Sequence, residues 1–524
     1  MDKQGSRWIV VAGFVACFLM AMAMGANDVA NAFGTSVGAG VVTLRQALVL
    51  AAVCNVGGAV LMSGAVTETI RKGIVDVERF SGDSGDGAPE ELMLLMLCAM
   101  VGSVAYVGGA TALRLPVSTT QAVLGGLVGA MISRDRGGGR GVRWSDGARV
   151  CRYSKRTGRL SCGGVAGVVL QWFVAPLISM VLAVALFRAS RVVLLDRDRA
   201  VALRRAPAYM ALLLGGVAFA LAWFVVVQQQ FHPHTRGWDP RNANDPVNRA
   251  TALEVVACAL AGVAAAWGAL TVFTLWPGAL RFAPAAPGPR TLELAPAPAG
   301  ASPKRNPLRR DDERPLTDGD GGDDGAAAPS PFGGADGAAT VAAHGAARSF
   351  DPDVEAVFGA AQVASAALAA FAAGANDVAN EVAPVAAIWQ TWADGEVRST
   401  ARTPKWLFLY AGAGVAAGLG LFGARVMRTV GRDATKMTPA RGFNIELGYS
   451  LASLVASAEG WPVSTTQLCV GAVVGVGLAS GDGARASDAV NTRLLARIFL
   501  SWVATPLVAG LVAALAYACL RPAL

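Results

Sequence analysis

The heptapeptide GANDVAN, residues 25–31, occurs a second time as residues 374–380, and this repeat decides the fold of the chain. Two further stretches recur in the same order: PVSTTQ at 116–121 and 462–467, and QWFVAP at 171–176, which returns as SWVATP at 501–506. The offsets of 349, 346 and 330 residues are similar. We infer an internal duplication, so any site built from these motifs draws on two copies.

The composition is that of a membrane protein. Of the 524 residues, 54% are hydrophobic and only 16% are charged, and the mean hydropathy is +0.46. An average soluble domain has about 25% charged residues. The apolar residues form runs of about 17–25, the length of a helix that crosses a bilayer. This excludes a soluble enzyme, a secreted disulfide scaffold and a disordered chain. We predict an all-α, polytopic membrane protein of about twelve transmembrane helices.

The duplication predicts two inverted halves. Seven apolar segments precede the second GANDVAN, so that copy enters the membrane from the opposite side, and a pseudo-two-fold axis lies in the membrane plane. The first half spans 1–281 and the second 351–524. Between them, 282–350 is rich in Ala, Pro, Gly and Asp and predicts a disordered loop, which we place on the cytoplasmic side.

The remaining charge, cysteine and histidine signals favour no other class of protein. The net charge of +8 suggests nucleic-acid binding, but the basic residues lie in loops between apolar runs, so no nucleic-acid partner is expected. His232 and His234 lie in a loop without further ligands, and we predict no transition-metal site and no cofactor. Cys151 and Cys162 flank a polar loop and could form a disulfide if that loop is extracellular.

GANDVAN brings polar oxygens into a membrane span. Asn27 and Asn31 are four residues apart and share a helix face, with Asp28 adjacent. A carboxylate at this depth requires a cation or a water-lined cavity. Gly25 and the glycines after residue 31 should loosen the helix and free main-chain carbonyls, which would complete an oxygen shell for sodium. The second copy provides Asn376, Asp377 and Asn380. The alternative is a polar clamp between helices.

PVSTTQ supplies donors for an anion. The proline begins a helix whose first N–H groups are unpaired, and three hydroxyls follow it. These hydroxyls belong to Ser118, Thr119 and Thr120 in the first copy and to Ser464, Thr465 and Thr466 in the second. Ordinary N-capping explains one hydroxyl per helix but not three. Together, the two motifs predict transport of an anion driven by a cation gradient.

The motifs resemble those of the inorganic phosphate transporter family of sodium–phosphate and proton–phosphate symporters. The matching elements, in order, are GANDVANAFGTSVGAGVVTLRQA, TETIRKGIVD at 67–76, PVSTTQ, the second GANDVAN, GFNIELGYS and the second PVSTTQ. The resemblance implies a central site in which Asp28 and Asp377 help to hold phosphate together with the Ser-Thr-Thr hydroxyls. It also implies coupling roles for Glu446 and Glu68, and a possible homodimer.

The sequence departs from the family pattern in three places. Asn55 stands where many members carry glutamate, and Gln121 and Gln467 stand where histidine is common. Glu381 adds a carboxylate beside Asn380, where the family usually has alanine. Glu381 therefore either binds a cation as a third coupling candidate or faces water at a helix end.

We therefore predict a multi-pass secondary transporter that works by alternating access, and no enzyme. Its substrates would be inorganic phosphate and sodium, its surroundings membrane lipid, and its location the plasma membrane rather than an organelle membrane. The alternatives are a proton-coupled phosphate symporter and a phosphate-sensing receptor that catalyses no flux.

Overall fold

A computed structural model describes the chain at residues 3–81, 88–113, 117–145, 150–154, 159–225, 246–275, 349–398, 403–423, 437–481 and 492–524. The elements of the first half are α1 (Arg7–Gly38), α2 (Leu44–Met62), α3 (Gly64–Gly73), η1 (Val77–Phe80), α4 (Pro89–Ala112), α5 (Thr119–Arg134), β1 (Cys151–Ser154), β2 (Arg159–Cys162), α6 (Gly164–Ser190), η2 (Arg191–Leu195), α7 (Arg199–Trp223) and α8 (Pro246–Leu275). Those of the second half are α10 (Pro352–Asp394), α11 (Lys405–Gly418), η6 (Leu419–Gly423), α13 (Pro439–Glu459), α14 (Thr465–Ser480), α15 (Thr492–Leu520) and η8 (Arg521–Ala523).

The protein is an all-α polytopic membrane protein, as predicted. Within the described ranges, eight helices are long and apolar enough to cross a membrane, and two shorter apolar helices lie at Val256–Leu270 and Thr465–Ser480. The count of about twelve spans stays a prediction, as do the domain boundaries. Residues 276–348, with nearly all of the predicted loop, lie outside the described residues, as do His232 and His234.

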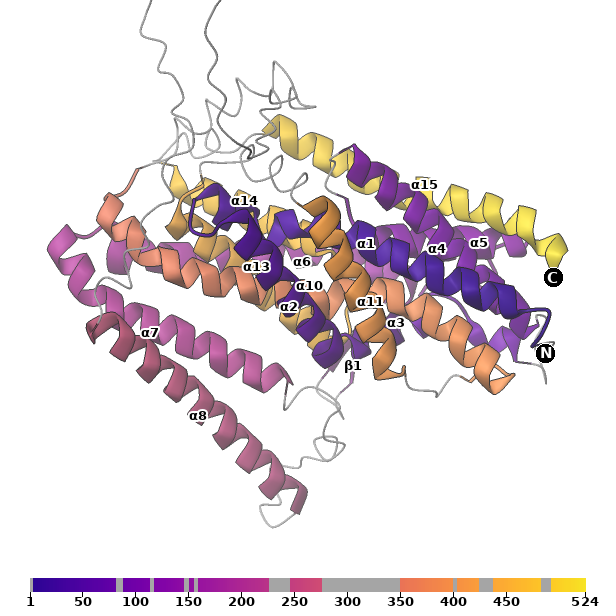
Figure 1. Ribbon diagram of the computed structural model, residues 1–524, viewed down its shortest axis with the longest axis horizontal. Coiled ribbons are helices and arrows are strands. Elements are labelled where there is room, and N and C mark those ends of the chain that lie inside the picture. Colours follow the sequence, from indigo (N-terminus) through magenta and orange to yellow (C-terminus); the bar gives the residue numbers. More distant parts are fainter. Residues whose placement is uncertain are drawn as a thin grey trace, which may run out of the picture.

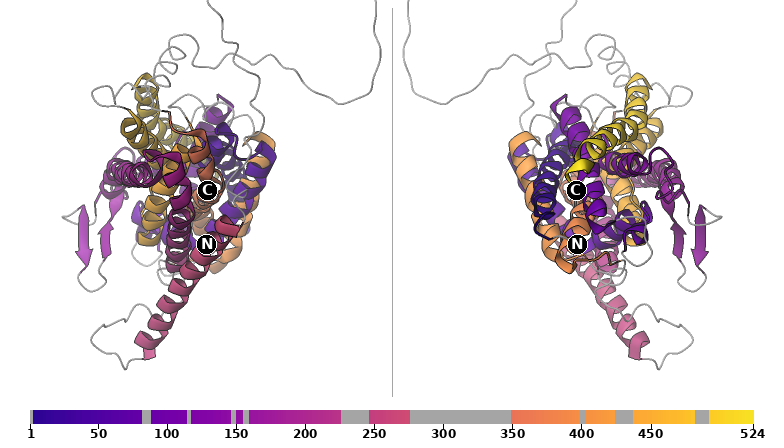
Figure 2. Two further views of the ribbon diagram at one scale, coloured as in Figure 1. Left: turned by 90° about the vertical axis from the view of Figure 1, so that its left-hand side faces the viewer. Right: turned by 90° about the vertical axis from the view of Figure 1, so that its right-hand side faces the viewer.

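A short hairpin is the one pair of strands in the described part of the chain. β1 and β2 are antiparallel, and Cys151 lies opposite Cys162 in their register. Cys151 is disulfide-bonded. Figure 2 shows the hairpin at the outer side of the helical body, and α8 extends away from that body along α7.

Equivalent helices of the two halves pack in exchanged pairs. α1 packs on α11 and α10 packs on α2, while α5 packs on α15 and α14 packs on α6. Two glycines allow the first exchange at close range. A Cβ at Gly25 would lie 2.3 Å from the Val415 carbonyl oxygen, and one at Gly374 would lie 2.0 Å from that of Asn55. The GANDVAN glycines therefore serve the approach of backbones rather than the unwinding of a helix.

The two GANDVAN helices, α1 and α10, run antiparallel. At the start of α1, Lys3 Nζ donates to the Ala393 carbonyl (2.8 Å), and Trp392 Nε1 donates to the Lys3 carbonyl (3.0 Å), so the end of α10 lies beside the N-terminus (Figure 1). At the other end of α1, Thr35 shares an acceptor with Gln362 of early α10. Antiparallel packing of equivalent helices is what an inverted duplication requires, and that relation itself remains a prediction.

The outer helices present an apolar surface. Large aliphatic side chains are exposed along α6 and α15, among them Leu177, Val181, Leu507, Leu511 and Leu515. In water, so large an apolar area would promote association, whereas in a bilayer it contacts acyl chains. The polar residues of the motifs are instead buried in the middle of the bundle.

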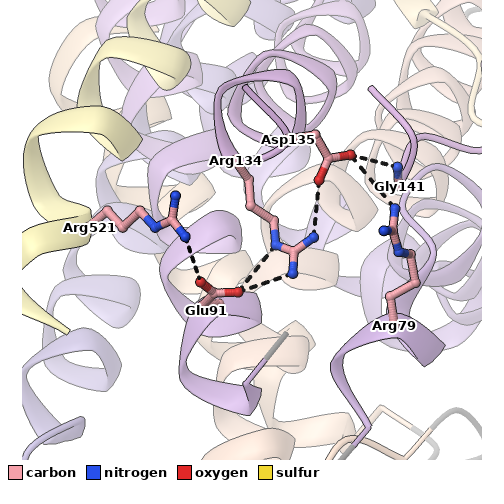
Figure 3. Close-up of polar contacts among 6 residues, drawn as sticks. All are labelled: Arg79, Glu91, Arg134, Asp135, Gly141 and Arg521. Carbon is pink, nitrogen blue, oxygen red and sulfur yellow. Dashed lines mark hydrogen bonds and ion pairs between the residues drawn. The ribbon is translucent and has the colours of Figure 1, made fainter. Parts of the chain in front are cut away.

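An ion-pair network ties the C-terminal end of the chain to the first half (Figure 3). The buried Arg134 guanidinium, at the end of α5, donates twice to Glu91 Oε2 of α4 (3.2 Å each) and once to Asp135 Oδ1 (3.0 Å). Glu91 Oε1 accepts from Arg521, which follows α15 (3.4 Å). Asp135 Oδ2 accepts from the Gly141 amide (2.8 Å) and pairs with Arg79 (3.7 Å). Glu91 thus joins three segments.

We expect Glu91→Gln to lower the unfolding free energy by about 1–3 kcal/mol, because hydrogen bonds to a charged group are replaced by bonds to a neutral amide. Thermal unfolding of the purified protein in detergent measures this change. Glu78→Gln, an exposed glutamate on the neighbouring η1, is the matched control and should unfold at the wild-type temperature. Equal unfolding temperatures for both variants would contradict the role given to the network.

Candidate functional site

Both Asn-Asp clusters lie in the middle of long, unbroken helices. Asn27, Asp28 and Asn31 of α1 are 1%, 5% and 7% exposed, and the three counterparts on α10 are at most 1% exposed. α1 continues to Gly38 and α10 to Asp394, so the expectation that Gly25 and the following glycines unwind the helix is wrong. Glycines in an apolar helix that is packed on both sides keep their helical hydrogen bonds, because no water competes for them.

The PVSTTQ segments begin α5 and α14 in the same way. Ser118 and Ser464 are the N-cap residues, and their hydroxyls accept from the amides of Gln121 (3.2 Å) and Gln467 (3.3 Å). The capping explanation therefore accounts for the serine of each triplet. The two threonines that follow each serine are in the first helical turn and buried, at 1–3% exposed. Their hydroxyls have other partners.

The threonine hydroxyls accept hydrogen bonds from the asparagine amides of the opposite half. Asn31 of α1 donates to Thr466 of α14 (2.9 Å). Asn380 of α10 donates to Thr119 and to Thr120 of α5 (3.1 Å each). The two contacts are reciprocal: each GANDVAN meets the hydroxyls of the other copy of PVSTTQ. The four motifs therefore converge on one place, which is the arrangement that the repeats predict for a shared site.

The first asparagine of each motif contacts its own half. Asn27 Oδ1 accepts from the Val117 amide (3.3 Å), and Asn376 Oδ1 accepts from the Val463 amide (3.2 Å). Two further bonds join the breaks before α5 and α14 to each other, because Thr120 donates to the Val463 carbonyl (3.1 Å) and Thr466 to that of Val117 (3.4 Å). Both helix N-termini are thereby held at the centre of the site.

The aspartates place two negative charges among these groups. Asp377 Oδ2 accepts from Thr465 (2.5 Å), and Asp28 Oδ1 accepts from Asn31 (3.4 Å). The two carboxylates are close enough to interact electrostatically. Within the described residues, neither is hydrogen-bonded to or ion-paired with a basic side chain. In their ionised form, two buried carboxylates without a cationic residue need bound cations.

The described residues contain no group of three or more His, Cys, Asp and Glu side chains that could hold a metal ion. A cation at this site would therefore take amide, hydroxyl or main-chain oxygens in addition to carboxylates. Such neutral oxygens are common ligands of hard cations. The helix N-termini and hydroxyls supply donors for an anion at the same place.

Glu446 forms a separate polar cluster beside the site. This carboxylate of α13 is fully buried and accepts from Thr35 and Ser36 (2.7 Å) of α1, and from Gln362 (3.4 Å) and Ser365 (2.5 Å) of α10. It thus joins the two GANDVAN helices to α13. The sequence pointed to Glu446 but not to its four partners. The spacing of these residues could have indicated them. Thr35 lies one helical turn after Asn31, and Ser365 lies one turn after Gln362, so each pair shares a helix face.

The other two predicted coupling residues, Glu68 and Glu381, differ in their exposure and in their distance from the motifs along the chain. Glu68 of α3 is partly exposed and pairs with Arg71 (2.9 Å) and Lys72. Its hydrogen-bond and ion-pair partners among the described residues include none from the four motifs. Glu381 of α10 is fully buried inside the helix, so of the two alternatives for this residue the one in which it faces water at a helix end is wrong.

One contributing residue was not predicted at all. Tyr449 of α13 is 1% exposed, and its hydroxyl donates to the Asn31 carbonyl (3.0 Å). A tyrosine in an apolar helix carries no sequence signal of its own, because most such rings only pack. Its position three residues after Glu446 puts both on the face of α13 that meets α1.

Comparisons with known proteins find matches along nearly the whole chain. The model of the phosphate transporter family matches residues 24–513. The chain is similar to the sodium-dependent phosphate transporter 1-A of Danio rerio, at 28% identity over 98% of this chain and 95% of that one. It is also similar to the phosphate-repressible phosphate permease of Neurospora crassa, at 28% identity over 96% of each chain. A solved structure, "The sodium-dependent phosphate transporter", matches with a TM-score of 0.71 and 25% identity, over 98% of this chain and 100% of that one.

Proposed function

Starting from the fact that the chain belongs to the phosphate transporter family, and is therefore a membrane transporter and not an enzyme, we propose that it carries inorganic phosphate together with sodium. One observation supports this most directly: the amides of each GANDVAN meet the hydroxyls of the opposite PVSTTQ at the centre of the bundle. A site made of two halves in this way can change its access by a rearrangement of one half against the other.

The site offers matching chemistry for both substrates. Phosphate oxygens would accept from the first-turn hydroxyls and amides of α5 and α14, where the helix dipoles favour negative charge. Sodium would take oxygens from the Asn-Asp clusters, whose carboxylates have no basic partner in the described residues. Each ion offsets the charge of the other in a buried place. Phosphate and sodium each bind weakly when the other is absent. The two ions are therefore transported together.

Alternating access follows from the energetics of this pair. A site with two carboxylates and phosphate but no sodium carries uncompensated negative charge, and its passage through the closed, dehydrated intermediate is costly. The loaded site, in which sodium balances the charge, and the empty site, which lacks the charge of phosphate and keeps its crosswise hydrogen bonds, are both less costly. Only the loaded site and the empty site should pass through the closed intermediate, so phosphate crosses the membrane together with sodium.

Radiolabelled phosphate uptake into proteoliposomes, with sodium and pH gradients set independently, tests this function. We expect concentrative uptake driven by an inward sodium gradient, and none when choline replaces sodium. Uptake that follows the pH gradient alone would replace sodium by protons as the coupling ion. Phosphate binding without any flux would show a receptor and refute transport.

A further inference from the structure

Glu381 is a buried carboxylate whose partner the structure does not supply. It lies on α10, one helical turn after Asp377, and its exposed fraction is 0%. Neither carboxylate oxygen has a hydrogen-bond partner in another described residue. A charge in such a position is unfavourable unless a proton neutralises it or a cation compensates it. In its ionised form, Glu381 therefore needs a bound cation.

The neighbours of Glu381 increase this need. The charged groups within electrostatic range of Glu381 are Asp377 on its own helix and Asp28 on α1, and both are negative. The other titratable neighbour on α1 is the thiol of Cys17. In the described part of the chain, no basic side chain forms an ion pair with Glu381. Three carboxylates therefore repel one another electrostatically, although they are not grouped closely enough to hold a metal ion by themselves, and phosphate adds further negative charge.

Other oxygens without partners lie next to Glu381 on the chain. Asn380 Oδ1 is buried and has no hydrogen-bond partner in the described residues, although its amide nitrogen donates to Thr119 and Thr120. Pro384 lies inside α10 and has no N–H, so it cannot donate to the Asn380 carbonyl four residues earlier. One turn of α10 thus offers carboxylate, amide and main-chain oxygens, the hard ligands that alkali and alkaline-earth cations prefer.

We propose that Glu381 supplies an oxygen to a sodium-binding site on α10, and that this site adds one sodium ion to those that move with each phosphate. The inference rests on the proposed transport function and adds to it a residue and a stoichiometry. One sodium at Glu381 returns the local charge to that of the two aspartates alone. The cycle then accumulates more phosphate from the same sodium gradient.

The first test measures the two fluxes together. Radiolabelled sodium and phosphate uptake is recorded in proteoliposomes of the wild type, Glu381→Gln and the control Glu355→Gln. Glu355 is a buried glutamate on the same helix, but it accepts from the Ala440 amide (3.0 Å) at the far end. We expect one sodium fewer per phosphate in Glu381→Gln and a less steep dependence of uptake on sodium, while Glu355→Gln keeps the wild-type ratio. An unchanged ratio in an active Glu381→Gln would overturn the proposal.

The second test does not require transport. Equilibrium binding of radiolabelled sodium to the purified protein counts the sites in variants that elute as the wild type does in size-exclusion chromatography. Glu381→Gln should lose one site, and Glu381→Asp should retain it with weaker affinity. A full set of sites in Glu381→Gln would refute the assignment. If the wild type carried no phosphate, the proposed function would fail, whereas this count would still decide on Glu381.

Discussion

Replacement of either central aspartate, as Asp28→Asn or Asp377→Asn, is expected to reduce sodium-driven phosphate uptake at least about a hundredfold. Each carboxylate is almost fully buried and has no basic partner in the described residues, so its charge is available to a cation. Loss of one partner of a buried charge pair costs about 3–5 kcal/mol, and each 1.36 kcal/mol is a factor of ten. Initial rates of radiolabelled phosphate uptake in proteoliposomes measure the effect.

The fold should survive these changes. Asparagine has the size of aspartate, and its oxygen can still accept from Thr465 or Asn31. Asp353→Asn is the matched control, because Asp353 lies on α10 with a 43% exposed side chain, outside the site, and should keep wild-type uptake. If both Asp28→Asn and Asp377→Asn transported phosphate as the wild type does, the site would be wrongly placed.

Replacement of Glu446 should affect both stability and transport. In Glu446→Ala, hydroxyl and amide donors from α1 and α10 lose their shared acceptor in a site from which water is excluded. Each buried donor left without a partner costs about 1–3 kcal/mol. We expect a lower unfolding temperature in detergent and loss of uptake, because the two GANDVAN helices are no longer held at α13.

Glu446→Gln separates the two effects. Glutamine keeps one acceptor oxygen and the size of the side chain, so most of the stability should return. Recovery of uptake as well would assign Glu446 a positioning role, whereas a stable but inactive Glu446→Gln would show that its charge takes part in coupling. Wild-type stability of Glu446→Ala would show that its four hydrogen bonds contribute little.

The sequence predicted which residues would meet but not how they pair. Two copies of two motifs implied that the motifs meet, and the hydrogen bonds of Asn31 and Asn380 show that they do, whereas their role as a binding site stays a prediction. The exchange of partners between the halves was not predictable, because it depends on how α5 and α14 pack against α15 and α6. Helix packing depends on the whole surface of each helix, so the polar residues of the motifs alone do not predict it.

The continuity of the helices was the weakest part of the prediction. Gly25 and the glycines after residue 31 were expected to loosen the helix, yet α1 and α10 run on through GANDVAN. Hydropathy marks where a span becomes polar, and not where its hydrogen bonds end. Glu381 illustrates the same limit of sequence-based prediction. A charged residue in an apolar sequence is compatible with a helix end as long as its neighbours in space are unknown.

The crosswise pairing of Asn31 with Thr466 also sets the order in which the protein can be assembled. These residues are 435 positions apart in the chain. At about 5–20 residues synthesised per second, the amide waits roughly 20–90 s in the membrane before its partner is made. During that interval the first half holds exposed polar groups in lipid. We therefore expect the first half to gain its full stability only after α14 has been made.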